Sequence, residues 1–130
     1  MRTLLEQADP IPHVERERAW PLDARMAMFV LEAGGADDGA THQRTAQRTP
    51  CRIMGTVCED DPQALAHAIV YVRDATQKHL GFICQSNLPV GKIVWLNFST
   101  PHGQKVQAPC RIGRSRPFMT GWNEGVLDLE

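Results

Sequence analysis

The sequence has no closely spaced pair of cysteines. Its four cysteines, Cys51, Cys58, Cys84 and Cys110, stand far apart, and no C-x-x-C pair occurs among them. Because zinc sites draw their ligands from closely spaced pairs, we expect no metal site. We expect the four cysteines to be small hydrophobic residues on strands, in a protein from a reducing compartment.

The chain also lacks any long hydrophobic run. No stretch approaches the roughly 18 apolar residues that a membrane-spanning helix needs. Glu6 follows Leu4 and Leu5 before the apolar core of a signal peptide is formed. We therefore expect a cytoplasmic protein with no membrane insertion.

Neither sign of charge is in clear excess, and aromatic residues are few. The 14 Lys and Arg residues against 15 Asp and Glu residues give a net charge of −1, and aromatic residues make up 6% of the chain. Nucleic-acid binding depends on neutralising many phosphates or on stacking bases, so we expect no DNA or RNA partner. Residues 1–40 hold four arginines and eight acids, a net of −4, which leaves +3 for residues 41–130.

The residue sets that catalysis requires are also missing. The sequence shows no Ser/His/Asp or Cys/His set, no metal-ligand cluster and no phosphate loop of the G-x-x-x-x-G-K-[ST] kind. We therefore expect no catalytic residues and no enzymatic activity. The histidines at positions 13, 42, 67 and 102 are scattered near turns, and we interpret them as surface residues.

What the chain does contain is a pair of arginines, Arg44 and Arg48, which stand four residues apart with no acid nearby and are followed by Arg52. A guanidinium group is a planar fork that binds a phosphate, pairs with the O6/N7 edge of guanine and stacks on a base. Two interpretations are open. The segment is either a clamp for a small anionic nucleotide or a solvated basic linker.

A second stretch, residues 72–82, reads V-R-D-A-T-Q-K-H-L-G-F and joins two strand-like runs. It resembles the second signature of the PilZ family, Asp/Asn-x-Ser-x-x-Gly followed by Leu-Gly-Phe, with Asp74 at the acid, Thr76 at the serine and His79 at the glycine. The order and separation of the two motifs also match, so the resemblance covers residues 43–129. PilZ domains are receptors for the bacterial second messenger cyclic di-GMP, and the resemblance implies that ligand here.

The resemblance implies a role for each matched residue. Arg44 and Arg48 bind the phosphates and the guanine O6/N7 edges, and Asp74 accepts from a guanine N1/N2 edge or orients an arginine. Thr76 supplies the hydroxyl of the family serine. Independently of any ligand, Asp74 and Thr76 also suit a turn cap.

His79 departs from the family pattern. If the family glycine serves a positive φ or a close approach of the ligand, a side chain there costs about 1 kcal/mol in strain or obstructs the site. The alternative is that the imidazole ring stacks on a guanine.

The periodicity of the sequence predicts a mainly β protein. Short runs with turn signals between them predict six strands, at residues 51–58, 68–73, 80–85, 92–98, 105–114 and 118–129. With the family resemblance, the expected fold is a six-stranded antiparallel PilZ-like β-barrel preceded by an N-terminal arm and one short α-helix. Residues 1–42 form the arm, helix and linker, and residues 43–130 form the barrel domain.

The helix is expected over residues 22–33, ended by a glycine pair. Its larger apolar residues fall at helical spacing and predict the stripe by which it docks: Leu22, Met26, Phe29, Val30 and Ala33. Trp20 is expected to anchor the arm that precedes it.

Side chains outside the two motifs are expected to be structural. Trp95 and Trp122 are interpreted as packing residues rather than a platform for stacking bases. Arg111, Arg114 and Arg116 are interpreted as solvated groups that extend a positive face.

Two functions remain open. The first is a small cytoplasmic receptor for cyclic di-GMP whose arginine segment becomes ordered on the ligand and changes the surface shown to a protein partner. The second is a degenerate PilZ module that binds no nucleotide and acts as a protein adaptor in pilus or motility control, with the helix and arm as its interface. The sequence leaves the identity of the protein partner open.

Overall fold

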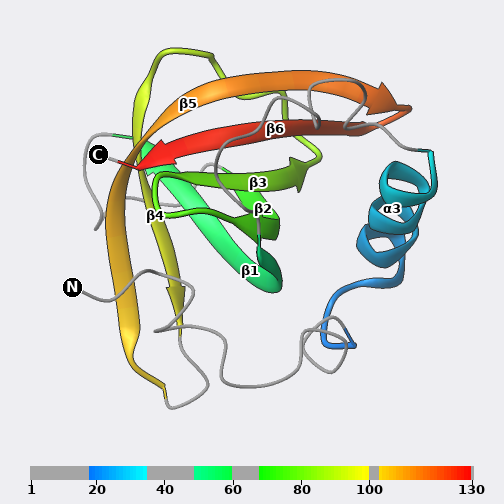
Figure 1. Ribbon diagram of the computed structural model, residues 1–130, viewed down its shortest axis with the longest axis horizontal. Coiled ribbons are helices and arrows are strands. Elements are labelled where there is room, and N and C mark those ends of the chain that lie inside the picture. Colours follow the sequence, from blue (N-terminus) through cyan, green and yellow to red (C-terminus); the bar gives the residue numbers. More distant parts are fainter. Residues whose placement is uncertain (1–17, 35–48, 60–67, 100–102, 130) are drawn as a thin grey trace.

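A computed structural model describes residues 18–34, 49–59, 68–99 and 103–129 of the chain. These residues form one helix, α3 (Leu22–Ala33), and six strands: β1 (Thr49–Glu59), β2 (Ala68–Ala75), β3 (His79–Cys84), β4 (Ile93–Ser99), β5 (Lys105–Met119) and β6 (Trp122–Leu129) (Figure 1). The expected mainly β fold, with six antiparallel strands in one sheet and one short helix, is confirmed. In this part of the chain, no helix has the length and apolar character needed to cross a membrane.

The strands follow the order β1-β2-β3-β6-β5-β4. Every neighbouring pair is antiparallel, and because β4 also pairs with β1, the circuit of pairings is closed. Closure gives each of the six strands a partner on both sides, which protects the sheet against pairing with other chains.

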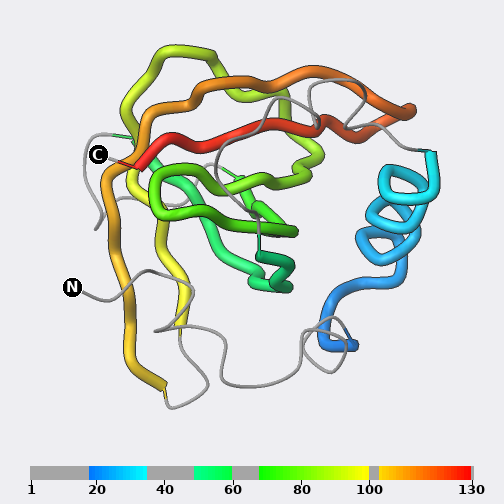
Figure 2. The backbone as a smooth tube through the Cα atoms, viewed as in Figure 1, coloured from blue at the N-terminus to red at the C-terminus, as the bar shows by residue number. Residues whose placement is uncertain are grey.

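The boundary between the last two strands differs from the sequence prediction. β5 continues through Gly113 and Pro117 to Met119, and β6 begins at Trp122 rather than at residue 118. Register shifts between Ile112 and Arg114, and again after Pro117, accommodate both residues within the strand. Figure 2 shows the long β5 in orange, curving before the chain returns as β6 in red.

The larger hydrophobic cluster fills the inner side of the sheet. Its alternation is clearest in β4, where Val94, Leu96 and Phe98 are buried and the residues between them are more exposed. This period of two is the pattern from which the strands were predicted. All four cysteines are buried on strands, as expected, and none of the four is in a disulfide, whereas the reducing compartment stays a prediction.

A second hydrophobic cluster lies between α3 and the outer side of the sheet. Tyr71 of β2, Ile83 of β3 and Trp122 of β6 supply its sheet side. Trp20 packs on Tyr71 with ring centroids 4.9 Å apart, and Tyr71 lies 6.0 Å from Trp122. The packing role of Trp122 is therefore confirmed, and Trp95 is half-buried on the outer side of β4. Trp20 is buried, but the arm that it was expected to anchor lies outside the described residues.

The bounds predicted for the helix are confirmed, but the face predicted to dock is wrong. The helix buries its smaller residues, Ala24 and Ala27, together with Met28 and Leu31. The expected stripe points away from the sheet: Leu22, Met26, Phe29 and Val30 are 65%, 54%, 67% and 42% exposed, and Ala33 is exposed as well. The buried face combines two alanines, which allow a close approach to the sheet, with Met28 and Leu31, which pack in one cluster with Trp20, Tyr71 and Trp122.

Candidate functional site

The predicted site begins at the turn between β2 and β3, where Thr76 organises the backbone. Its Oγ1 accepts from the backbone N–H groups of Lys78 at 3.2 Å and His79 at 3.0 Å. Its own N–H donates to the carbonyl oxygen of His79 at 2.8 Å. Thr76 is therefore the turn cap that the sequence offered as one interpretation. Because the oxygen already accepts from two amides, the hydroxyl hydrogen is the part that remains for a ligand.

Asp74 lies at the end of β2, and its carboxylate is laid across Gly81 of β3. A Cβ atom at Gly81 would stand 2.4 Å from Asp74 Oδ1, so glycine is what permits this position. Asp74 Oδ2 is 3.7 Å from Arg73 Nε, and the side chain is mostly buried. This carboxylate is therefore held at a fixed place on the surface of the sheet.

His79 opens β3 and pairs in the ladder with Asp128 of β6. Its Nδ1 lies 2.8 Å from Asp128 Oδ1, and about half of the histidine side chain is exposed. Since an extended strand needs no positive φ, the strain considered for a side chain at this position does not arise. Asp128 instead fixes the plane of the ring.

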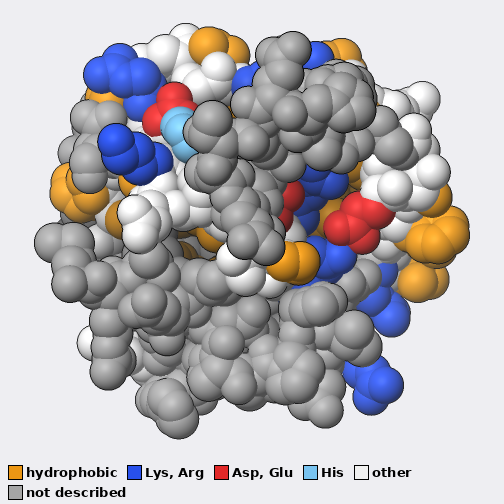
Figure 3. Space-filling view, in the orientation of Figure 1, with side chains coloured by type: hydrophobic (Ala, Val, Ile, Leu, Met, Phe, Trp, Pro, Cys, Tyr) orange, Lys and Arg blue, Asp and Glu red, His pale blue; other side chains and the backbone are white. Residues whose placement is uncertain are grey.

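Asp128 was not found from the sequence, although it is a charged residue inside the apolar run of β6. Its carboxylate is laid across Gly113 of β5, where a Cβ atom would stand 2.6 Å from Oδ2. Arg111 is its ladder partner on the same strand as Gly113. Figure 3 shows a histidine and an acidic side chain in contact, with Lys and Arg side chains nearby. The signal in the sequence that could have identified Asp128 is its charge at an outward-facing position of the last strand.

Asp74, His79 and Asp128 share the outer side of the sheet. Their chain neighbours Ala75, Leu80 and Leu127 are core residues, and alternation turns the three polar side chains outward. The structure thus brings Asp74, Thr76 and His79 of the predicted site together and adds Asp128 to them.

Arg44 and Arg48 lie outside the described residues. The chain enters the sheet directly after them, and Thr49 and Pro50 pair with Ala75 and Asp74. The prediction that the two arginines meet the β2–β3 turn stays a prediction.

Arg52, which follows the two arginines in the sequence, is a buried residue with partners of its own. It is 6% exposed, and its Nη2 donates to both carboxylate oxygens of Glu32 in α3, at 2.9 and 2.8 Å. Its Nη1 donates to the carbonyl oxygens of Cys51 and Arg73. Arg52 is therefore a structural residue that joins the last turn of α3 to β1 and β2.

Arg114 and Arg116 are likewise more than solvated groups. Both bind Glu124 of β6, with Arg114 Nη2 at 2.7 Å from Oε1 and Arg116 Nε donating to Oε2. The glutamate side chain is only 5% exposed. Two partly exposed guanidinium groups thus neutralise a buried carboxylate. These ion pairs form because β5 pairs with β6, and the sequence alone did not show that pairing.

Two groups under and beside α3 have raised pKa values. Burial raises the pKa of the Tyr71 phenol, and the nearby charges of Asp23 and Cys84 add to the effect. Burial also raises the pKa of the Cys84 thiol, while hydrogen bonds from Ser86 oppose the rise. Cys84 therefore stays protonated near neutral pH and does not have the character of a reactive thiolate.

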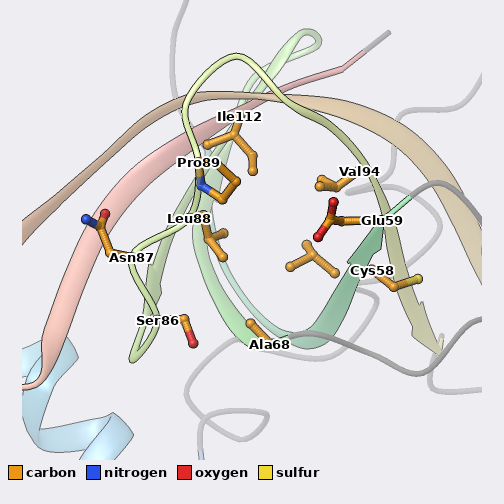
Figure 4. A pocket seen from close by; sticks show the side chains of 10 residues that line it. Cys58, Glu59, Ala68, Ser86, Asn87, Leu88, Pro89, Val94 and Ile112 are labelled. Atoms are coloured by element: carbon orange, nitrogen blue, oxygen red, sulfur yellow. The ribbon is translucent and has the colours of Figure 1, made fainter.

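A separate cavity of about 240 Å³ lies between β1, the start of β2 and the residues that join β3 to β4. Figure 4 shows Leu88, Val94 and Ile112 around it, with Glu59 beside Val94. Lys92 forms an ion pair with Glu59. Asp74, Thr76 and His79 do not line this cavity, so it is distinct from the predicted site.

The described residues hold no group of three or more His, Cys, Asp or Glu side chains arranged to bind a metal ion. A scan against models of known protein families finds no match, and a search of curated proteins finds none either. The chemistry that the outer face offers is that of two fixed carboxylates, a half-exposed imidazole and a hydroxyl donor beside the entry of an arginine-bearing segment.

Proposed function

We propose that this chain is a PilZ-type receptor or adaptor that binds cyclic di-GMP between its arginine segment and the outer face around Asp74, Thr76 and His79. On this proposal the closed six-stranded sheet is the family's β-barrel. The receptor would be cytoplasmic and would signal through the order that the ligand imposes on the arginine segment.

The observation that carries the proposal is the register between β1 and β2. Because Thr49 pairs with Ala75, and Pro50 with Asp74, the chain leaves the arginine segment at the β2–β3 turn. Arg48 directly precedes Thr49 in the sequence, and consecutive Cα atoms are only about 3.8 Å apart, which supports a site that includes both Arg48 and Asp74. The two PilZ-like motifs are 30 positions apart when counted from Arg44 to Asp74. The pairing of Thr49 and Pro50, which follow the first motif, with Ala75 and Asp74 supports a site that both motifs share.

The side chains divide the recognition of the ligand between them. The guanidinium groups of Arg44 and Arg48 bind the phosphates and the O6/N7 edges of guanine. The fixed carboxylate of Asp74 accepts from guanine N1 and N2, and the Thr76 hydroxyl donates. The His79 ring, held by Asp128, offers a face on which a guanine stacks.

The test is isothermal titration of the purified chain with cyclic di-GMP, with GTP and GMP as comparison ligands. Selective binding is expected, and Arg44→Ala and Arg48→Ala are each expected to weaken it about 10- to 100-fold, the loss typical of a bidentate guanine contact. His79→Gly should weaken binding because it removes the stacking face; tighter binding in this variant would show that the ring obstructs the site.

Lys105→Ala is the matched control. Lys105 is an exposed cation at the start of β5, which Figure 1 shows apart from β2 and β3. Its removal should leave the affinity unchanged. Unchanged affinity in both arginine variants, with their thermal unfolding also unchanged, would refute the assignment.

A protein adaptor that has lost its nucleotide is the second candidate. Two observations favour it: the oxygen of Thr76 is occupied by two backbone amides, and a histidine stands where the family has glycine. On this alternative cyclic di-GMP produces neither heat nor thermal stabilisation, and the arm and helix are the interface for a protein of pilus or motility control. The same titration therefore separates the two candidates.

A further inference from the structure

The helix α3 has two apolar faces on opposite sides. Of its twelve residues only Asp23, Arg25 and Glu32 are charged or polar. The inner face packs on the sheet, and the outer face, made by Leu22, Met26, Phe29 and Val30, is exposed. Figure 3 shows hydrophobic side chains gathered at the right margin, where Figure 1 places α3. An exposed cluster of large apolar side chains usually marks a surface that binds another molecule, and no described residue covers the outer face.

The spacing of the outer face fits another helix. Leu22, Met26, Phe29 and Ala33 follow one another at intervals of four, three and four residues. This is the repeat by which one helix packs its side chains into the holes of a second helix. The outer face is therefore shaped for a helical partner rather than for a flat surface or a small ligand.

The charges that flank this seam are complementary to those of a second copy. Arg25 and Glu32 are seven residues apart, two turns along the same flank of the helix. When two such helices pair in antiparallel orientation, Arg25 of one lies opposite Glu32 of the other, and the two-fold axis repeats the pair. We propose that two copies of this chain form a dimer through the outer faces of α3, packed antiparallel.

Both members of the charge pair are available for this contact. Arg25 forms no ion pair within the described residues, and its buried Nε has no hydrogen-bond partner there. The Glu32 carboxylate accepts two bonds from Arg52 yet remains 44% exposed. A carboxylate has about four acceptor positions, so it can bind a second guanidinium group.

The size of the helix sets the strength of the dimer. Twelve residues span about 18 Å, which places the contact at the small end of specific interfaces. The dimer is therefore reversible, with a dissociation constant on the order of 10–100 µM.

The test is sedimentation equilibrium of the full chain, without nucleotide, over concentrations that bracket this range. The wild type should pass from monomer to dimer as the concentration rises. Phe29→Glu should weaken the dimer about tenfold or more, because it would bury an unpaired carboxylate in the seam. Arg25→Glu should also weaken it about tenfold by opposing like charges, whereas Arg25→Lys should remain within about threefold of the wild type.

Ile69→Glu is the matched control, because Ile69 is a similarly exposed apolar residue on β2 rather than on α3. It should leave the dimer intact. A chain that stays monomeric at every concentration would overturn the proposal, as would a dimer that Phe29→Glu does not weaken. If the chain is monomeric and Phe29→Glu lowers the melting temperature far more than Ile69→Glu, another segment of the same chain covers the face, and the dimer is again ruled out.

Discussion

Replacing Leu31 by alanine tests how α3 is attached to the sheet. Leu31 is 2% exposed and belongs to the cluster that contains Trp20, Tyr71 and Trp122. Leu→Ala substitutions at buried sites cost about 2–5 kcal/mol, through lost transfer free energy and the cavity that remains. Because Leu31 is almost fully buried in a cluster that contains three large aromatic side chains, we expect a loss of about 3 kcal/mol in the free energy of unfolding.

Phe29→Ala is the partner experiment, since it removes a larger apolar side chain from the same helix. Phe29 is 67% exposed, so its removal should change the free energy of unfolding by less than about 0.5 kcal/mol when measured on the monomer at low concentration. The contrast between the two variants, rather than either value alone, reports which face is docked.

The assay is urea unfolding followed by far-ultraviolet circular dichroism and by tryptophan fluorescence. Two of the three tryptophans, Trp20 and Trp122, lie in the cluster beneath α3, so fluorescence reports directly on helix docking. The dependence of the free energy on urea should keep the wild-type slope in both variants. A Phe29→Ala loss equal to or larger than the Leu31→Ala loss would refute the observed orientation of the helix.

Two further predictions concern the sheet. Gly81→Ala should destabilise the protein by about 1–3 kcal/mol, because its methyl group displaces the Asp74 carboxylate; in an Asp74→Ala background the loss should shrink, and strict additivity in the double-mutant cycle would contradict this cause. Stability should also fall as pH rises above about 8.5 and again above about 10, because unfolding lowers the raised pKa values of Cys84 and Tyr71 to their ordinary values. Tyr71→Phe should abolish the second fall, and since the chain has one tyrosine, tyrosinate absorbance measures it directly; an unaltered second fall would exclude Tyr71 as its source.

The strands and the helix bounds were predictable because local patterns determine them. Alternation marks β4, and Pro21 and Gly34 flank α3. The end of β5 was not predictable, because Gly113 and Pro117 interrupt a strand in most contexts and are accommodated here only through the register with β6. Strand pairing is a long-range property, so it lies beyond a local pattern.

The docked face of α3 shows the same limit in another form. The helix carries two apolar stripes, one with Leu22, Met26 and Phe29 and the other with Met28, Leu31 and two alanines. Helical periodicity alone does not choose between them. The docked stripe is the one that packs in a cluster with Trp20, Tyr71 and Trp122, and that cluster depends on contacts between residues far apart in the sequence.

The site was predictable only in part. The turn-capping role of Thr76 follows from local chemistry and is confirmed. The Asp128 partner of His79 and the Glu32 partner of Arg52 are 49 and 20 residues away along the chain, so they required the three-dimensional arrangement. A charged residue whose ion-pair partner is far away in the sequence looks like a solvated residue when only the sequence is known.

The bond between Arg52 and Glu32 also has a consequence for the segment between them. It joins residues 20 positions apart and so makes the intervening chain, which carries Arg44 and Arg48, into a closed loop. Closing a loop costs conformational entropy, and here the contacts formed on folding compensate for that cost. Ligand binding would therefore not have to supply it. If the chain has the function proposed above, replacing Arg52 should weaken ligand binding without removing any contact to the ligand, because binding would then have to supply the entropy of closing this loop.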